Sequence, residues 1–236
     1  MWHQFKVRHE LVSILCTPDT LACAWIRPSH SAHPFEVIAY KRISLTNLEL
    51  AQGRICNPTR IGSHIVSFLT KHNLTNAYIT LVLHGPMVHE ELISMHTASP
   101  QPEEIPLQKK HQLVWNYRYL YSQDNAQAAF YVCGIPQPVL LHYKLLAIRH
   151  NLNVVSITTR SMAYLHVYTH VYGTAFRHSQ LAYDMTRCDN RIDNLISREM
   201  ITRNLAMPHV YTTHIDQELP LLTPLFGSWL SEQGCL

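Results

Sequence analysis

Glycine is scarce in this chain: the 236 residues include seven glycines, and none of them occurs before Gly53. Loops that bind nucleotide phosphate depend on glycine, because a backbone without Cβ atoms brings several N–H groups close to the phosphate oxygens. The first turn between two apolar segments instead reads Thr17-Pro18-Asp19-Thr20. It offers a proline without an N–H group and a carboxylate that repels phosphate. We therefore expect this turn not to bind a nucleotide.

Charged residues are also few, at 15 % of the chain against about 25 % in a typical globular protein. The formal charge of +3 includes no block of lysine or arginine, so nucleic-acid binding is not favoured. The apolar content of 47 % is enough for one large domain or two small ones. The 17 histidines predict that acid lowers stability or alters association, since they gain charge below about pH 6.5.

Two further patterns are missing, a membrane-spanning run and a C-x-x-C pair. No apolar run approaches the roughly 18 residues that a membrane helix needs, and Leu11–Cys16 is too short for a signal-peptide core. The six cysteines lie mostly in apolar segments, which is typical of reduced, buried thiols. These patterns predict a cytoplasmic protein. The cysteines are Cys16, Cys23, Cys56, Cys133, Cys188 and Cys235.

Hydrophobic periodicity predicts an α/β (α+β) fold with a mixed sheet. Strands are expected at Glu10–Cys16, Leu21–Arg27, Glu36–Ser44 and Ala77–Leu83, a helix at Thr59–Asn73, and a return segment at Met87–Ile93. After a polar, proline-bearing stretch at Thr97–Pro106 we expect a hairpin at His111–Tyr121 and Ala126–Cys133, with its turn at Gln123-Asp124-Asn125. A helix at Pro136–Asn151, a strand at Asn153–Thr158 and a helix at Arg160–Tyr172 follow.

The Pro136–Asn151 helix places Leu140, Leu141, Leu145 and Ile148 on one side.

Beyond Gly173 the pattern weakens, and Gln180–Met185, His209–Thr213 and Leu219–Leu230 are expected to form two strands and a helix. The division that follows has three parts: a first subdomain over residues 1–96, a second small α/β subdomain over 107–172, and a reduced C-terminal region over 173–236.

The histidine pair at His166 and His170 has the spacing of metal ligands on one helix face, and His178 lies nearby. With 17 histidines in the chain, about one such pair is expected by chance, and the glutamate of a metalloprotease motif is missing. Candidate serine nucleophiles lack a glycine-flanked turn. We therefore predict neither a metal site nor catalytic residues.

The aromatic row Trp115, Tyr117, Tyr119 and Tyr121 has a spacing of two residues, which predicts that all four rings share one face of a strand. The favoured interpretation is packing in the core or under the Pro136–Asn151 helix. The alternative is a surface on which a partner peptide docks.

Three stretches together resemble one protein family: Val12–Ser44 with the helix Ile61–Leu69, the strand and turn of Tyr78–Val88, and the strand-helix-strand-helix run of Phe130–Ala163. Their order is similar to that of PilM and its HofM-type relatives, actin-like proteins of type IV pilus assembly. FtsA and the cytoplasmic part of the secretion protein GspL also resemble this group. The resemblance implies an actin-like, ribonuclease-H-like layered fold, here shortened and degenerate.

The resemblance also implies a function: a non-enzymatic cytoplasmic scaffold of a type IV pilus or type II secretion assembly. Such a scaffold holds the peptide tail of a PilN-like inner-membrane protein, is peripheral to the membrane through that partner, and lies at the inner-membrane face. The second glycine-rich acidic turn of nucleotide-binding members is replaced by residues 186–190, which lack glycine, so we expect no cofactor. The alternative is a small Mg²⁺-dependent enzyme of the ribonuclease-H-like superfamily. It requires converging carboxylates, and Val12–Cys16 contains none.

Overall fold

The computed structural model describes residues 10–29, 33–96, 112–122, 127–172, 191–206 and 215–233, together with Leu181, Asp184, Met185 and Arg187. The strands are β1 (Leu11–Cys16), β2 (Thr20–Pro28), β3 (Phe35–Ser44), β4 (Leu50–Ala51), β5 (Arg54–Ile55), β6 (Tyr78–Leu83), β7 (His89–Met95), β8 (Leu113–Ser122), β9 (Ala128–Pro136), β10 (Asn153–Thr159) and β11 (Leu205–Ala206). The helices are α1 (Pro58–Lys71), α2 (Gln137–Arg149), α3 (Arg160–Tyr172), the short 3₁₀ helix η2 (Ile192–Leu195), α5 (Arg198–Asn204) and α7 (Ile215–Gln233).

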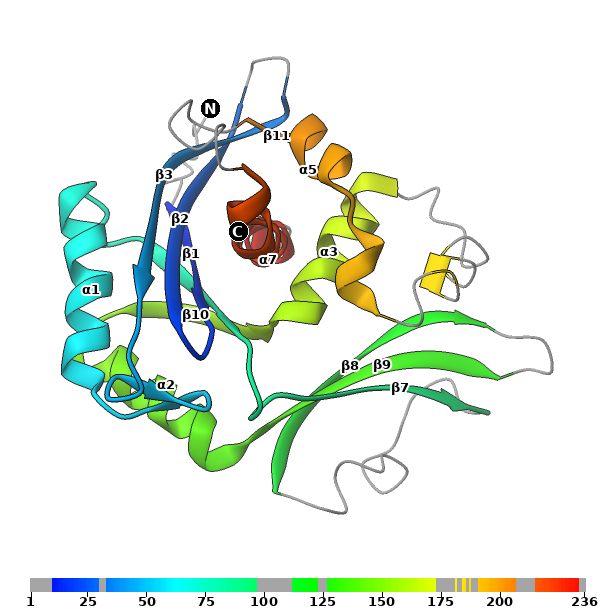
Figure 1. The fold of residues 1–236 in the computed structure, drawn as a ribbon, viewed down its shortest axis with the longest axis horizontal. Helices are drawn as coiled ribbons and strands as arrows, with labels where there is room; N and C mark the ends of the chain where they lie inside the picture. The colour runs from blue at the N-terminus through cyan, green and yellow to red at the C-terminus, as the bar shows by residue number, and fades with distance from the viewer. Residues whose placement is uncertain are drawn as a thin grey trace, which may run out of the picture.

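A six-stranded mixed sheet forms the centre of the molecule, in the order β10-β6-β1-β2-β3-β11 (Figure 1). Short connections make β1, β2 and β3 antiparallel neighbours. Strands β6 and β10 run parallel to β1 and to each other, because α1 precedes β6 and α2 precedes β10 as crossover helices. This arrangement confirms the predicted α/β class with a mixed sheet.

Helices cover both faces of this sheet (Figure 1). One face packs against α1 and α2, and Val12, Ile14 and Cys16 of β1 point into that layer. The other face packs against α3 and α7, where Leu11 and Leu15 of the same strand lie. The alternation along β1 therefore separates two apolar cores, which explains why every residue of this strand is buried.

Helix α1 forms where the sequence predicts it. The Asn57 side chain accepts a hydrogen bond from the Arg60 N–H group at 3.0 Å, and Pro58 occupies the first turn, where a missing N–H group costs nothing. The expected apolar positions Ile61, Ile65, Phe68 and Leu69 are buried against the sheet.

A second sheet of three strands, in the order β7-β9-β8, lies below and to the right of the central sheet in Figure 1. Its two antiparallel pairings include the hairpin partners β8 and β9, as predicted. One of its faces packs against α3 through a cluster that includes Tyr131, Cys133, Leu165 and Tyr168. The helix that follows β10 therefore contacts both sheets.

Helix α2 packs on the central sheet through a different side from its leucine row. Its buried residues are Val139, Tyr143, Leu146 and Ala147. Three of the four predicted apolar residues, Leu141, Leu145 and Ile148, are exposed on the outer side. The helix is apolar on two sides, so periodicity by itself did not indicate which side packs against the sheet.

The weakly patterned C-terminal part differs from expectation, and its elements η2, α5 and β11 were not predicted. A strand was expected at Gln180–Met185, but the described residues of that segment, Leu181, Asp184 and Met185, are helical. The predicted helix Leu219–Leu230 lies within α7 and is confirmed. The predicted strand at His209–Thr213, the Thr97–Pro106 boundary and the Gln123-Asp124-Asn125 turn lie outside the described residues.

The three-part division of the chain stays a prediction. The central sheet includes strands from each of the three predicted parts: β1, β2, β3 and β6 from the first, β10 from the second and β11 from the third. Within the described ranges, no helix has the length and apolar character that crossing a membrane requires.

Candidate functional site

The turn between β1 and β2 is closed by its own side chains. The Thr17 N–H group donates to the Thr20 carbonyl at 2.9 Å, and the Thr17 hydroxyl donates to the Asp19 carboxylate at 2.9 Å. That hydrogen bond lowers the pKa of Asp19, so the carboxylate is charged at neutral pH. A phosphate approaching this turn meets a negative charge.

The loop after β6 packs closely against the same turn. Gly85 has a φ of +141°, which favours glycine, and a Cβ atom there would lie 3.2 Å from Cγ of Pro18. The His84 N–H group donates to the Cys16 carbonyl at 3.0 Å. The pyrrolidine ring of Pro18 therefore packs directly against Gly85, and Pro18 itself has no N–H group to offer an anion.

Polar side chains gather where β6 and β10 end, the edge at which open α/β sheets bind ligands. The Arg160 guanidinium donates to Nε2 of His84 at 3.2 Å and to the Tyr164 hydroxyl at 3.3 Å. The Ser161 hydroxyl donates to the Glu90 carboxylate at 2.8 Å. Burial, and then the Arg160 charge, lower the pKa of His84, which keeps its imidazole neutral.

This cluster offers one carboxylate, one imidazole and one guanidinium. The second Glu90 oxygen, Oε1, and the Arg160 Nε atom are buried, and neither has a hydrogen-bond partner in the described part of the chain. Across that same part, no group of three or more His, Cys, Asp or Glu side chains is placed to hold a metal ion. Buried polar atoms of this kind are commonly satisfied by ordered water.

Three of the four predicted aromatic residues share one face of the three-stranded sheet. The rings of Trp115 and Tyr117 stack with centroids 5.6 Å apart, and Tyr117 and Tyr119 each contact Phe130 edge-on at 5.8 and 5.7 Å. Ile93 of β7 belongs to the same apolar cluster. Trp115 and Tyr117 are half-buried and Tyr119 is 39 % exposed.

Tyr121 lies on the opposite face, so the prediction that all four rings share one face is wrong at this residue. The β8–β9 register shifts between Tyr119 and Tyr121, which makes Leu120 an extra residue in β8. Leu120 and Tyr121 are both buried in the cluster that packs against α3. A bulge of this kind reverses the side-chain alternation beyond it, and the sequence spacing does not reveal it.

The aromatic face packs in an apolar cluster of its own sheet and not under α2, so of the two kinds of packing in the favoured interpretation the structure shows the core one. Its cluster consists of β7, β8 and β9 residues, and the buried side chains of α2 belong to the core of the central sheet. The rings therefore pack on Phe130 and Val132 of the neighbouring strand. Their role as a partner-binding surface stays a prediction.

The predicted histidine pair is divided between two environments. Arg118, on the α3-facing side of β8, donates to Nδ1 of His166 at 3.1 Å and to the Thr169 hydroxyl at 2.8 Å. His170 instead packs its ring against Phe35 and Phe226. Burial, and then the Arg118 charge, lower the pKa of His166 to about 4.

The low pKa of His166 predicts a loss of stability in acid. This residue binds its proton near pH 6.5 in the unfolded chain and near pH 4 in the folded chain. The free energy of unfolding therefore decreases as the pH is lowered from 6.5 to 4. From pH 7 to pH 5 this residue contributes a loss of about 2 kcal/mol. We expect His166→Gln to remove that share of the pH dependence in urea unfolding, because glutamine accepts the Arg118 hydrogen bond without titrating. His142→Gln, at an exposed histidine, is the matched control, and equal pH slopes for all three proteins would refute the assignment.

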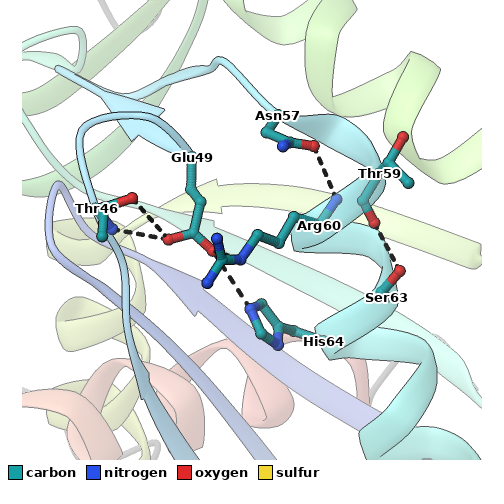
Figure 2. A network of polar contacts seen from close by, with 7 residues as sticks. All are labelled: Thr46, Glu49, Asn57, Thr59, Arg60, Ser63 and His64. Atoms are coloured by element: carbon teal, nitrogen blue, oxygen red, sulfur yellow. Dashed lines mark hydrogen bonds and ion pairs between the residues drawn. The ribbon is translucent and has the colours of Figure 1, made fainter.

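A buried glutamate organises the connection between β3 and α1, and sequence reasoning missed it. Figure 2 shows that Glu49 receives hydrogen bonds from the Thr46 N–H group and hydroxyl, both at 2.9 Å. Its other oxygen lies 2.9 Å from Nε of Arg60 and 3.4 Å from Nε2 of His64. The spacing Thr46-x-x-Glu49 is that of a capping box, a signal that could have identified the pair. The network holds the first turns of α1 against the loop that follows β3, so we assign it a structural role.

Comparison with known proteins identifies the fold and leaves the family open. No family model matches the chain, and a search of curated proteins finds no match. Among solved structures, the chain is similar to the PilM-PilN type IV pilus biogenesis complex, with 13 % identity and a TM-score of 0.52 over 91 % of this chain and 78 % of that one. At this identity the likeness shows the fold alone, and it confirms the predicted actin-like, layered α/β architecture.

Two further structures are more distant. The cytoplasmic domain of EpsL, an inner membrane component of the type II secretion system of Vibrio cholerae, is 11 % identical, with a TM-score of 0.40 over 65 % of this chain and 57 % of that one. A Bacteroides thetaiotaomicron protein with an actin-like ATPase fold and unknown function is 9 % identical, with a TM-score of 0.42 over 95 % and 98 %.

Proposed function

We propose that this chain is a non-enzymatic scaffold of a type IV pilus or type II secretion assembly. It acts at the cytoplasmic face of the inner membrane by holding the peptide tail of a PilN-like inner-membrane protein. The observation that carries the proposal is the β1–β2 turn, where Pro18 packs against Gly85 and the Asp19 carboxylate stands in place of N–H donors. An actin-like domain without a phosphate cradle acts by binding partners.

The aromatic face supports the choice of a peptide as partner. Trp115, Tyr117 and Tyr119 present three adjacent rings with partly exposed surfaces. Rings of this kind bury a large apolar area at low conformational cost, which is why they are common in peptide-binding surfaces. The fold is shared with a complex whose second named component is PilN, and this indicates the kind of tail to test.

The test is a titration of the full chain with the labelled cytoplasmic tail of a PilN-like protein encoded beside it. We expect micromolar binding, and we expect Tyr117→Ser with Tyr119→Ser to weaken it at least tenfold, since each ring contributes about 1 kcal/mol or more. Tyr172→Ser is the matched control, because Tyr172 is 42 % exposed on α3. Equal affinity for the doubly substituted and wild-type chains would remove the aromatic face from the proposal.

A second titration tests the lost nucleotide site. We expect no calorimetric signal when ATP and Mg²⁺ are added to the full chain, because the β1–β2 turn offers no anion cradle. Micromolar ATP binding would contradict the scaffold proposal directly, whatever the tail titration shows. Substituting Asp19→Gly and Pro18→Gly together is the companion variant, since it restores two backbone positions that can approach phosphate.

A further inference from the structure

The outer side of α2 carries a row of exposed aliphatic residues. Leu141 and Leu145 are each 52 % exposed and Ile148 is 75 % exposed. At about 100° per residue these positions fall within one narrow sector of the helix. Val155 of the neighbouring strand β10 is also 43 % exposed. Single exposed leucines are common on proteins, but a continuous row on one helix marks an interaction surface.

A cationic side chain borders this row on each side. Lys144 lines a groove of about 700 Å³ between α2 and β10, together with Leu140 and Ile157. Arg149 lines a smaller hollow of about 190 Å³ on the other side, with Ile55 and Leu145. In the described part of the chain, neither cation has a carboxylate within ion-pair distance.

The segments that form α1, α2 and β10 contain no acidic residue. Residues 50–89 and 125–183 include no aspartate or glutamate, and these ranges contain α1, α2 and β10. Helices α1 and α2 contact each other on one face of the central sheet (Figure 1), so the two acid-free segments combine into one surface. Lys71 and Arg54 add exposed cations to this surface. The acidic residue that directly precedes the first range, Glu49, is only 2 % exposed, and its charge is paired with Arg60.

We propose that this α2 surface, defined by Leu141, Lys144, Leu145, Ile148 and Arg149, binds directly to a membrane that carries anionic lipid headgroups. Helices that lie in a membrane interface have an apolar row that enters the headgroup boundary, with lysine and arginine beside it that reach the phosphates. The lack of acid removes the repulsion that would oppose such contact. This inference goes beyond the scaffold role, because it requires no partner tail.

The proposal is tested with the full chain and sedimented vesicles. One set contains phosphatidylcholine and phosphatidylglycerol at roughly three to one, and the other contains phosphatidylcholine only. We expect binding to the anionic vesicles and little to the neutral ones, and we expect it to weaken as salt rises from about 0.1 to 0.5 M, because salt screens the attraction.

Two pairs of substitutions separate charge from apolar contact. Lys144→Gln with Arg149→Gln is expected to weaken binding about twenty- to thirtyfold, and Leu145→Gln with Ile148→Gln at least tenfold. Arg191→Gln with Arg203→Gln removes the same net charge elsewhere and should change binding less than about threefold. Leu48→Gln, at a residue 82 % exposed on another loop, is the apolar control. All these side chains are exposed, so the variants should fold.

Failure to bind either vesicle would overturn the proposal, as would equal loss in the α2 and control variants. If the chain binds neither kind of vesicle but binds an acidic amphipathic peptide through the same residues, the α2 surface binds a protein partner instead of a membrane. Tail binding measured without vesicles reports on the scaffold role separately, so either proposal can fail without the other.

Discussion

Replacing Gly227 with alanine is expected to lower the free energy of unfolding by about 3 to 4 kcal/mol. Gly227 lies in α7 directly against the α3 backbone, and a Cβ atom there would overlap the carbonyl oxygen and carbon of Ala163. Backbone atoms have no alternative rotamer, so the two helices must separate. Their separation loosens the packing of Phe226 and Trp229, which are buried beside this crossing.

The matched control for this prediction is Gly62→Ala in α1. A Cβ atom at Gly62 would meet the ring of His150, which is the end of a side chain that can turn away. We expect a change within about 1 kcal/mol, because alanine favours the helix and offsets the lost contact. Urea unfolding followed by circular dichroism measures both variants. A Gly227→Ala protein as stable as the wild type would show that the α3–α7 contact is not rigid.

Replacing Glu49 with alanine is expected to cost about 3 kcal/mol of stability. The Glu49 side chain is 2 % exposed and accepts hydrogen bonds from the N–H group and the hydroxyl of Thr46, while Arg60 pairs with it. Hydrogen bonds to a charged group contribute about 1.5 kcal/mol or more each, and alanine leaves the Thr46 N–H group without its partner. Glu49→Gln keeps one acceptor and should lose about half as much.

Acid should reproduce part of the Glu49 effect. The Thr46 N–H hydrogen bond, with smaller contributions from the Thr46 hydroxyl and Arg60, lowers the pKa of Glu49. The Glu49 contribution is therefore complete above the unfolded pKa near 4.5 and disappears as pH falls through the lower folded value. Glu199→Ala removes an exposed ion pair with Arg203 and should change stability by less than about 0.5 kcal/mol. A similar loss in both variants would contradict the buried network.

Much of the fold could be predicted because its elements follow local periodicity. The predicted helix Arg160–Tyr172 has the bounds of α3, and the predicted strand Asn153–Thr158 differs from β10 by one residue. Both segments are apolar-rich runs, and a polar turn at residues 150–152 separates them from the preceding helix. The strand predicted at residues 180–185 was wrong, because this segment is short and has no clear hydrophobic periodicity.

The candidate site could be predicted less well, since it depends on contacts between distant segments. The spacing of Trp115, Tyr117 and Tyr119 predicted correctly that these three rings share one face of the strand. It placed Tyr121 wrongly, because the bulge at Leu120 is set by pairing with β9. The side chains Glu90 and Ser161, 71 residues apart, meet only because β7 and α3 pack together.

The sequence by itself determined that the β1–β2 turn carries a proline and a carboxylate and no glycine, since this belongs to Pro18 and Asp19 whatever surrounds them. It also determined most of the helices and strands. Only the tertiary structure decided which side of α2 is buried, because Val139 and Leu141 are equally apolar and the sheet contacts one of them. Likewise, packing of α1 against α2 joins two acid-free segments into one surface, and no local pattern encodes that contact.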